Sequence, residues 1–257
     1  MWWITTYRLD LKTQASYRLD FAIQIIIWVL YASLPLLVVG VMVEKFPNSG
    51  MNISQVALLY CAVQIGYETS RMLERALDDF HTETSKGHLD RLLVRPRALL
   101  PMIISSRIFP RRIAGITAGL AGGVIGMSGR ENIEDALFLL IVAIISSGLV
   151  FSGLLTIYAA SCFLTVTRNM FADVVTGSLV TLSLAPIENF ATPLQFLVSY
   201  VIPIRTTLQS PIRSIDDGVA FQLFADVIIP IASAAAFYAF SVAIFQYCRR
   251  FYQSPGA

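Results

Sequence analysis

The chain has 257 residues, of which 56% are hydrophobic and 14% are charged, and its formal net charge is +2. Ordinary soluble domains carry about 25% charged residues, and a soluble core of this length could not bury so many apolar side chains. The composition therefore predicts a protein surrounded by membrane lipid and argues against a very apolar soluble enzyme. We expect no nucleic-acid partner.

The chain begins with a charged, amphipathic stretch at residues 1–19, which is typical of a helix that lies in the membrane interface. It is not a secretory signal, because the apolar run that follows is too long and lacks a cleavage site. That run, residues 21–43, has 23 positions without a charge, and a second apolar segment covers residues 53–73. Both are long enough to cross the hydrocarbon core, which takes about 20 residues.

A polar block, ETSKGHLDRLLVRPRALL, follows the second apolar segment. Leu89, Leu92 and Leu93 are spaced i, i+3 and i+4, which predicts one face of a short helix. Gly87 relaxes the backbone at the start of this helix, and Pro96 ends it. One interpretation is a solvated loop whose basic residues bind anionic lipid. The leucine face favours contact with a protein surface, because an exposed apolar stripe is normally covered.

Four further apolar segments bring the predicted number of spans to six, and the first of these four is rich in glycine. Small residues four positions apart allow helices to approach closely. We favour packing within the chain over a seam between two copies. The segments are residues 108–129, 136–163, 171–186 and 225–248, and the glycines are Gly115, Gly119, Gly122, Gly123 and Gly126.

The stretch after the fifth predicted span, LAPIENFATPLQFLVSYVIP, is irregular. A simple spanning helix would not carry three prolines together with the carboxylate of Glu188. Irregular backbone at membrane depth is tolerated only where it is buried in protein or lines a watery cavity. We therefore expect residues 186–203 to be irregular rather than one spanning helix; a seventh span over residues 189–204 is the alternative. The prolines of this region are Pro186, Pro193, Pro203 and Pro211.

The distribution of basic residues predicts the orientation of the chain. With six spans, both termini lie on one side, which holds fifteen Lys and Arg residues against four on the other. The positive-inside rule then places both termini in the cytoplasm. Within the second span, Glu68 is followed after one or two turns by Arg71 and Arg75, which predicts a local ion pair.

Few residues could carry chemistry. The sequence has no G-x-x-x-x-G-K-[ST] phosphate loop, so the chain cannot hydrolyse ATP in that manner. The sequence GMSG resembles an intramembrane serine motif, but the only histidines, His81 and His88, lie in the polar region and cannot activate a serine within the membrane. No cluster has metal-ligand spacing. We therefore expect no enzyme activity and no bound metal or cofactor.

The polar block resembles the coupling loop of ABC-2 type exporter permeases, in which a Glu precedes Gly-x-Leu-x-x-Leu-Leu-x-x-Pro. The pairs Leu-Asp and Arg-Pro are similar to a bacterial subgroup in which two sister permeases and a separate ATPase are often encoded together. A weaker similarity lies in SYVIPIRTTLQSP, where Arg205, Thr206 and Thr207 replace the more apolar residues of that subgroup. The residues that match the first motif are Glu83, Gly87, Leu89, Leu92, Leu93 and Pro96.

This resemblance implies an all-α permease of the bacterial inner membrane that forms half of an exporter's translocation path. A second permease, identical or a sister, would pair with it, usually through spans one and five. An ABC ATPase dimer would supply ATP and Mg²⁺ and would grip the coupling helix between spans two and three. Residues 186–203 would form a re-entrant outer hairpin of two short helices at the mouth of the translocation path. The implied coupling residues are Glu83, Lys86, Gly87, His88, Leu89, Asp90, Arg91, Leu92, Leu93, Arg95 and Pro96.

Two other functions stay open. A membrane scaffold without transport would lack an ATPase partner. A self-contained secondary transporter often has inverted repeats and charges near the membrane midplane, and the sequence has no convincing repeat. The substrate is not predicted. If the coupling interpretation holds, Leu92→Asp should uncouple transport without preventing membrane insertion.

Overall fold

The computed structural model describes residues 23, 26, 27, 29–34, 37, 52–85, 87–130, 132–165, 170–184, 191–216 and 222–252. Every element in this part of the chain is helical. The predicted interfacial helix, residues 1–19, and most of the predicted first span lie outside it. The described positions of that span include a helical stretch at residues 29–34, which is tied to the rest of the fold by a hydrogen bond from the Tyr60 hydroxyl to the Ala32 carbonyl (2.5 Å).

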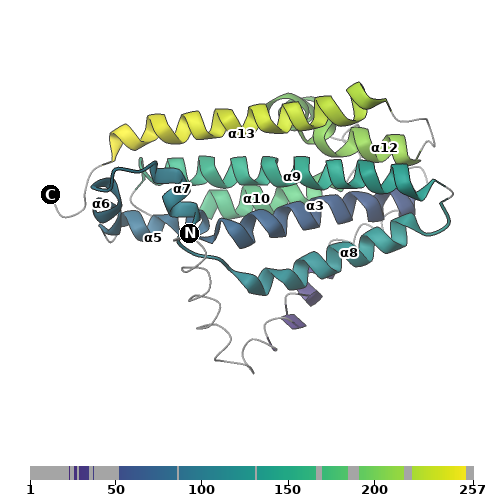
Figure 1. Ribbon diagram of the computed structural model, residues 1–257, viewed down its shortest axis with the longest axis horizontal. Coiled ribbons are helices and arrows are strands. Elements are labelled where there is room, and N and C mark those ends of the chain that lie inside the picture. The colour runs from purple at the N-terminus through teal and green to yellow at the C-terminus, as the bar shows by residue number, and fades with distance from the viewer. Residues whose placement is uncertain are drawn as a thin grey trace.

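In the described part of the chain, the five helices of 14 or more residues lie side by side (Figure 1). The longest has 29 residues, and at 1.5 Å per residue it is about 43 Å long, more than the hydrocarbon thickness of about 30 Å. The five helices are α3 (Ile53–Leu73), α8 (Ile113–Met127), α9 (Ile133–Ser161), α10 (Met170–Ser183) and α13 (Ile229–Cys248).

In the described part of the chain, two helices are long and apolar enough to cross a membrane: Ile133–Ser161 and Leu223–Phe251. The second consists of the π-helix η6 (Leu223–Ile228), α13 and the short η7 (Arg249–Phe251). Helices α8 and α10 have only 15 and 14 residues. The arrangement of six spans therefore remains a prediction.

Short helices gather at the two ends of the long bundle. At the end where α3 finishes lie α4 (Arg75–Asp78), α5 (Phe80–Ser85), α6 (His88–Leu93), α7 (Leu99–Ile104) and η2 (Pro110–Arg112). Figure 1 shows α5, α6 and α7 together with the last turns of α13 at this end, and α12 at the opposite one. The segment that contains α12 comprises α11 (Thr192–Phe196), η4 (Leu197–Val201), η5 (Arg205–Gln209) and α12 (Ser210–Asp216).

Helix α3 lies at the centre because it packs on both α8 and α9. The glycines of α8 face α3 so closely that an added Cβ at any of them would lie 2.6–2.8 Å from an α3 side chain. A larger residue would have to push the helices apart. The five glycines and their α3 neighbours are Gly115 with Glu68, Gly119 with Ile65, Gly122 with Tyr60, Gly123 with Cys61 and Gly126 with Leu58.

The contact between α3 and α9 depends on small side chains and on hydrogen bonds to backbone carbonyls. The Ser147 hydroxyl donates to Ala62 O (2.7 Å), and the Ser70 hydroxyl donates to Gly148 O (2.8 Å). Between these bonds, an added Cβ at Gly66 would meet the Ser147 hydroxyl. Hydrogen bonds between helices and close approach of small residues are the forces that hold apolar helices together in lipid.

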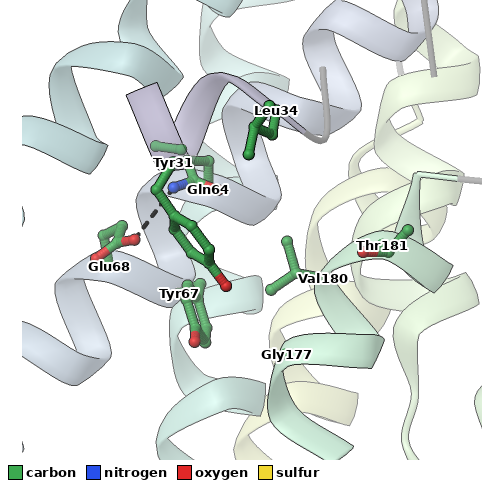
Figure 2. A pocket seen from close by; sticks show the side chains of 9 residues that line it. Tyr31, Leu34, Gln64, Tyr67, Glu68, Gly177, Val180 and Thr181 are labelled. Carbon is green, nitrogen blue, oxygen red and sulfur yellow. Dashed lines mark hydrogen bonds between the residues drawn. The ribbon is translucent and has the colours of Figure 1, made fainter. Parts of the chain in front are cut away.

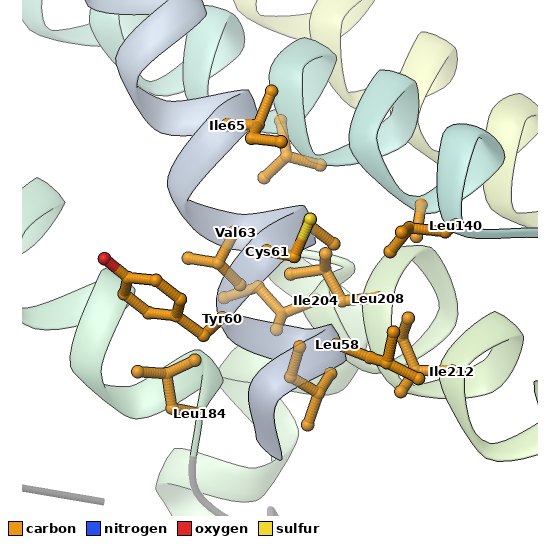
Figure 3. Close-up of a cluster of buried hydrophobic side chains, with 14 of the residues drawn as sticks. Leu58, Tyr60, Cys61, Val63, Ile65, Leu140, Leu184, Ile204, Leu208 and Ile212 are labelled. Carbon is orange, nitrogen blue, oxygen red and sulfur yellow. The ribbon is translucent and has the colours of Figure 1, made fainter. Parts of the chain in front are cut away.

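Around α3 lies the main apolar core, which is drawn in Figure 3. Leu58 and Cys61 of α3 meet Leu140 of α9 and the buried residues Ile204 and Leu208, which come from the η5 region. On the outside, apolar residues are exposed: Leu120 and Val124 of α8 are 54% and 72% accessible. An apolar surface of this kind is what lipid contact requires.

The segment predicted as an outer hairpin, residues 186–203, contains one short helical piece in its described part, where two were expected. Helix α11 continues into η4, and this ten-residue piece is about 15 Å long, too short for a seventh span. The next helical piece, η5 followed by α12, begins after Pro203 and therefore lies beyond the predicted hairpin. The threonines that depart from the subgroup pattern stabilise this break, because Thr207 and Thr206 donate their hydroxyls to Pro203 O (2.6 and 3.1 Å). Pro186 and Glu188 lie outside the described residues.

Candidate functional site

Helix α6, the predicted coupling helix, begins at Gly87, whose φ of 68° lies in the left-handed region that favours glycine. Its Leu89 is completely buried against residues of this same chain, among them Leu77 and Phe80. Leu92 is partly buried against the same cluster. The leucine face expected to meet a partner is therefore largely covered by the protein's own helices.

The exposed apolar surface instead lies at the C-terminal end of α6. Leu93 is 40% and Val94 is 85% exposed, and they are followed by exposed Arg95, Pro96 and Arg97. We call residues 93–97 the tip. Beside it is a surface hollow of about 420 Å³ lined by Arg95, Pro96, Arg97 and Met102. Among the other predicted coupling residues, Asp90 is half-buried, whereas Lys86 and the side chains of Glu83, His88 and Arg91 lie outside the described part.

The helices that carry the tip are fixed to the ends of the long helices through aromatic contacts. The ring of Phe80 in α5 lies 5.2 Å from that of Phe163, just after α9, and Phe163 lies 5.1 Å from Phe245 of α13. Edge-to-face pairs at these distances add to the stabilisation from burial. The helices that carry the tip are therefore connected to α9 and α13 through packed aromatic side chains.

Ion pairs hold α4, the first of the short helices, at the end of α3. Arg71 pairs with Asp78, and Arg75 pairs with Asp78 and Asp79 (2.9 and 3.0 Å). The guanidinium of Arg75 also lies 5.0 Å from the ring centroid of Phe109. Helix α4 and the end of α3 are thus linked by charge.

The sequence prediction for Glu68 was wrong, because its partner is Arg112 and not the nearby Arg71 or Arg75. The Arg112 Nη1 donates to Glu68 Oε2 at 2.7 Å, and both side chains are almost completely buried. Gln64 Nε2 donates to the other oxygen, Oε1, at 3.1 Å. This pair connects α3 to the start of α8 over a separation of 44 residues, which local spacing could not reveal.

A cavity of about 260 Å³ lies beside this ion pair, between residues 31–34, α3 and α10 (Figure 2). Its lining is mostly apolar, with two tyrosine rings, and includes the buried Glu68 and Gln64. The lining residues are Tyr31, Ala32, Leu34, Gln64, Tyr67, Glu68, Gly177, Val180 and Thr181.

A second buried carboxylate, Glu74, was not singled out from the sequence. It follows α3 directly and accepts a hydrogen bond from the Ser152 hydroxyl of α9.

At the opposite end of the bundle, Arg130 donates to Gly126 O (3.1 Å) and to Ser54 Oγ (3.3 Å). Within the described residues, no group of three or more His, Cys, Asp and Glu side chains could hold a metal ion.

The described residues form a bundle of apolar helices with a charged helical cap at one end, an arrangement that is consistent with a membrane protein. The family described as ABC-2 family transporter protein matches residues 26–256. The chain therefore belongs to the ABC-2 transporter family, whose permeases are membrane components that associate with an ABC ATPase and lack ATPase activity themselves. No curated protein and no solved structure matches the chain.

Proposed function

We propose that the chain is the permease half of an ATP-driven exporter in a bacterial inner membrane, and that a separate ABC ATPase grips its tip, residues 93–97. A second permease, a copy or a sister chain, completes the path. Both termini and the tip face the cytoplasm. ATP and Mg²⁺ are bound by the ATPase, and this chain couples the closure of the ATPase dimer to movement of its helices.

The observation that carries this proposal is an apolar and basic tip on a rigid support. The exposed side chain of Val94 is an aliphatic anchor, and the exposed Arg95 and Arg97 that follow it can orient a partner. The support is packed: Leu89 below the tip is fully buried, and the aromatic rings of Phe80, Phe163 and Phe245 join it to the long helices. A rigid support is what the transfer of force to the membrane helices requires.

Charge supports the proposed orientation. The described residues of the tip end include Arg75, Arg95, Arg97, Arg249 and Arg250, and the packing of Tyr252 on the same apolar cluster puts the described C-terminal residues at this end. Basic residues concentrate on the cytoplasmic side of membrane proteins.

The decisive experiment purifies the tagged chain from its native membranes, with the co-purifying protein identified by its phosphate-loop sequence and its ATPase activity. Val94→Asp should lose most of the ATPase, because a charge at the centre of the contact must be desolvated, while the thermal stability of the permease stays unchanged. Asp135→Lys, an exposed change at the opposite end of the bundle, is the matched control and should keep the ATPase.

Two outcomes contradict the proposal. If Val94→Asp retains the wild-type amount of ATPase, the tip is not the docking site. If no protein with a phosphate loop co-purifies, the chain is a scaffold or a self-contained transporter. Transport by membrane vesicles that continues with a non-hydrolysable nucleotide would favour the latter.

A further inference from the structure

The cavity beside Glu68 has walls from three parts of the chain. Tyr31 and Leu34 come from the predicted first span, Tyr67 from α3 and Val180 from α10, and Figure 2 shows these side chains around one space. Its volume of about 260 Å³ lies just below the range of roughly 300–1,000 Å³ for small-molecule pockets. A molecule of two or three rings would fill it.

The groups on the wall leave no uncompensated charge. The Glu68 carboxylate is paired with Arg112 on one oxygen and accepts from Gln64 on the other. Arg71, which donates to the Tyr67 hydroxyl at 2.6 Å, is itself paired with Asp78. A cation or an anion that entered would lose its hydration without gaining an unpaired opposite charge. This balance favours an uncharged ligand.

The wall offers a hydrogen-bond acceptor beside the two tyrosine rings. Gln64 uses its amide N–H on Glu68, and within the described residues no donor reaches its carbonyl oxygen, Oε1, which is not sealed from the cavity. Because this oxygen is accessible from an apolar cavity, a ligand that donates an N–H or O–H to it would gain about one hydrogen bond. The rings of Tyr31 and Tyr67 offer surfaces for a flat aromatic group.

The backbone of α10 leaves room for such a group. A Cβ added at Gly177 would meet nothing within 4 Å, so this lining position opens onto empty space. Other glycines at helix contacts, such as Gly122, are closed by neighbouring side chains. A side chain at position 177 would therefore enter the cavity without disturbing the helix packing.

We propose that this cavity binds an uncharged aromatic molecule with one N–H or O–H donor, whose rings lie against Tyr31 and Tyr67 and whose donor meets Gln64 Oε1. The statement that such molecules are the exported substrates rests on the proposed function. The statement that the cavity binds them can be tested without the ATPase.

The test measures saturable binding of tritiated N-phenyl-1-naphthylamine to the full-length chain in lipid nanodiscs, with empty nanodiscs as background. This probe is uncharged and aromatic and has one N–H. Its N-methyl analogue lacks the donor and should bind about fivefold more weakly, the effect of one hydrogen bond. The related 8-anilinonaphthalene-1-sulfonate, an anion, and ethidium, a cation, should bind more weakly still.

Three variants locate the site. Gly177→Phe fills the cavity and should weaken binding at least about tenfold. Gln64→Leu should weaken binding of the parent probe about fivefold and leave that of the N-methyl analogue unchanged. Leu120→Phe, on the exposed face of α8, is the matched control and should bind as the wild type does.

The proposal fails if Gly177→Phe binds the probe as well as the wild type, which would indicate partition into lipid. It also fails if ethidium or the sulfonate binds more tightly than the uncharged probe. The probe and its N-methyl analogue are compared on the wild-type chain, so misfolding of a variant cannot affect the measured ratio of their affinities. Val94→Asp should leave probe binding intact, which separates failure at this site from failure of the proposed ATPase docking.

Discussion

Removing one partner of the buried Glu68–Arg112 pair should destabilise the protein far more than removing both. The two side chains are 2% and 3% accessible and their charged atoms are 2.7 Å apart. In Arg112→Met, the Glu68 carboxylate keeps only the hydrogen bond from Gln64 at 3.1 Å. An uncompensated buried charge of this kind costs about 3–5 kcal/mol.

Glu68→Met should cost a similar amount, because a guanidinium cannot deprotonate to escape burial. The double variant replaces both charges by unbranched apolar side chains of similar length, which adapt to the space beside Gly115. Its loss of stability should be smaller than that of either single variant, since replacing a whole buried pair is often close to neutral.

Thermal unfolding of the purified permease in detergent, followed by intrinsic fluorescence, measures these differences. At about 2–4 °C per kcal/mol for a chain of this size, each single variant should lower the melting temperature by roughly 6–20 °C. If the loss in the double variant equals the sum of the two single losses, the two charges do not stabilise each other and the pairing is refuted.

Three further predictions test the packing. Gly122→Ala should lower the free energy of unfolding by about 1–3 kcal/mol, because the added Cβ would lie 2.7 Å from the Tyr60 ring. Gly177→Ala has open space at its Cβ and should be neutral or slightly stabilising in the same thermal-shift assay. Leu89→Ala should lower the free energy of unfolding by about 2–5 kcal/mol, and Val94→Ala should leave it almost unchanged. Equal losses of stability would contradict the assignment of Leu89 to the core. Thr207→Val should lower the free energy of unfolding by about 1 kcal/mol, because it loses the 2.6 Å hydrogen bond to Pro203 O. Thr206 is more exposed and its bond is longer, so Thr206→Val should lower stability less. The reverse order would refute this explanation.

The sequence allowed the long helices to be recognised because apolar length is a local property. Helix α3 covers Ile53–Leu73, the same residues as the second predicted span, and α9 and α13 were equally visible as uncharged runs. The spacing of Leu89, Leu92 and Leu93 also predicted a short helix correctly. It could not show which surface covers the leucines, because residues such as Leu77 and Phe80 reach Leu89 only when the short helices fold against one another.

The candidate site depends on contacts that no local pattern encodes. Glu68 had three basic residues within reach in principle, and the spacing rule for helices favoured Arg71 and Arg75 over Arg112. The chain reversal between α3 and α8 brings Arg112 back beside Glu68, and Asp78 and Asp79 occupy the other two arginines. Val94 was missed because it follows the helix and belongs to no periodic pattern. The cavity joins residues from three separate segments and had no sequence signal.

The triangle of Phe80, Phe163 and Phe245 has a consequence for how the protein is made. Phe80 leaves the ribosome early, Phe163 after the middle of the chain, and Phe245 only when α13 is nearly complete. The base that supports Val94 therefore cannot close until the last long helix has been inserted. A partly synthesised chain that lacks α13 therefore also lacks one of the three aromatic rings on which the tip rests.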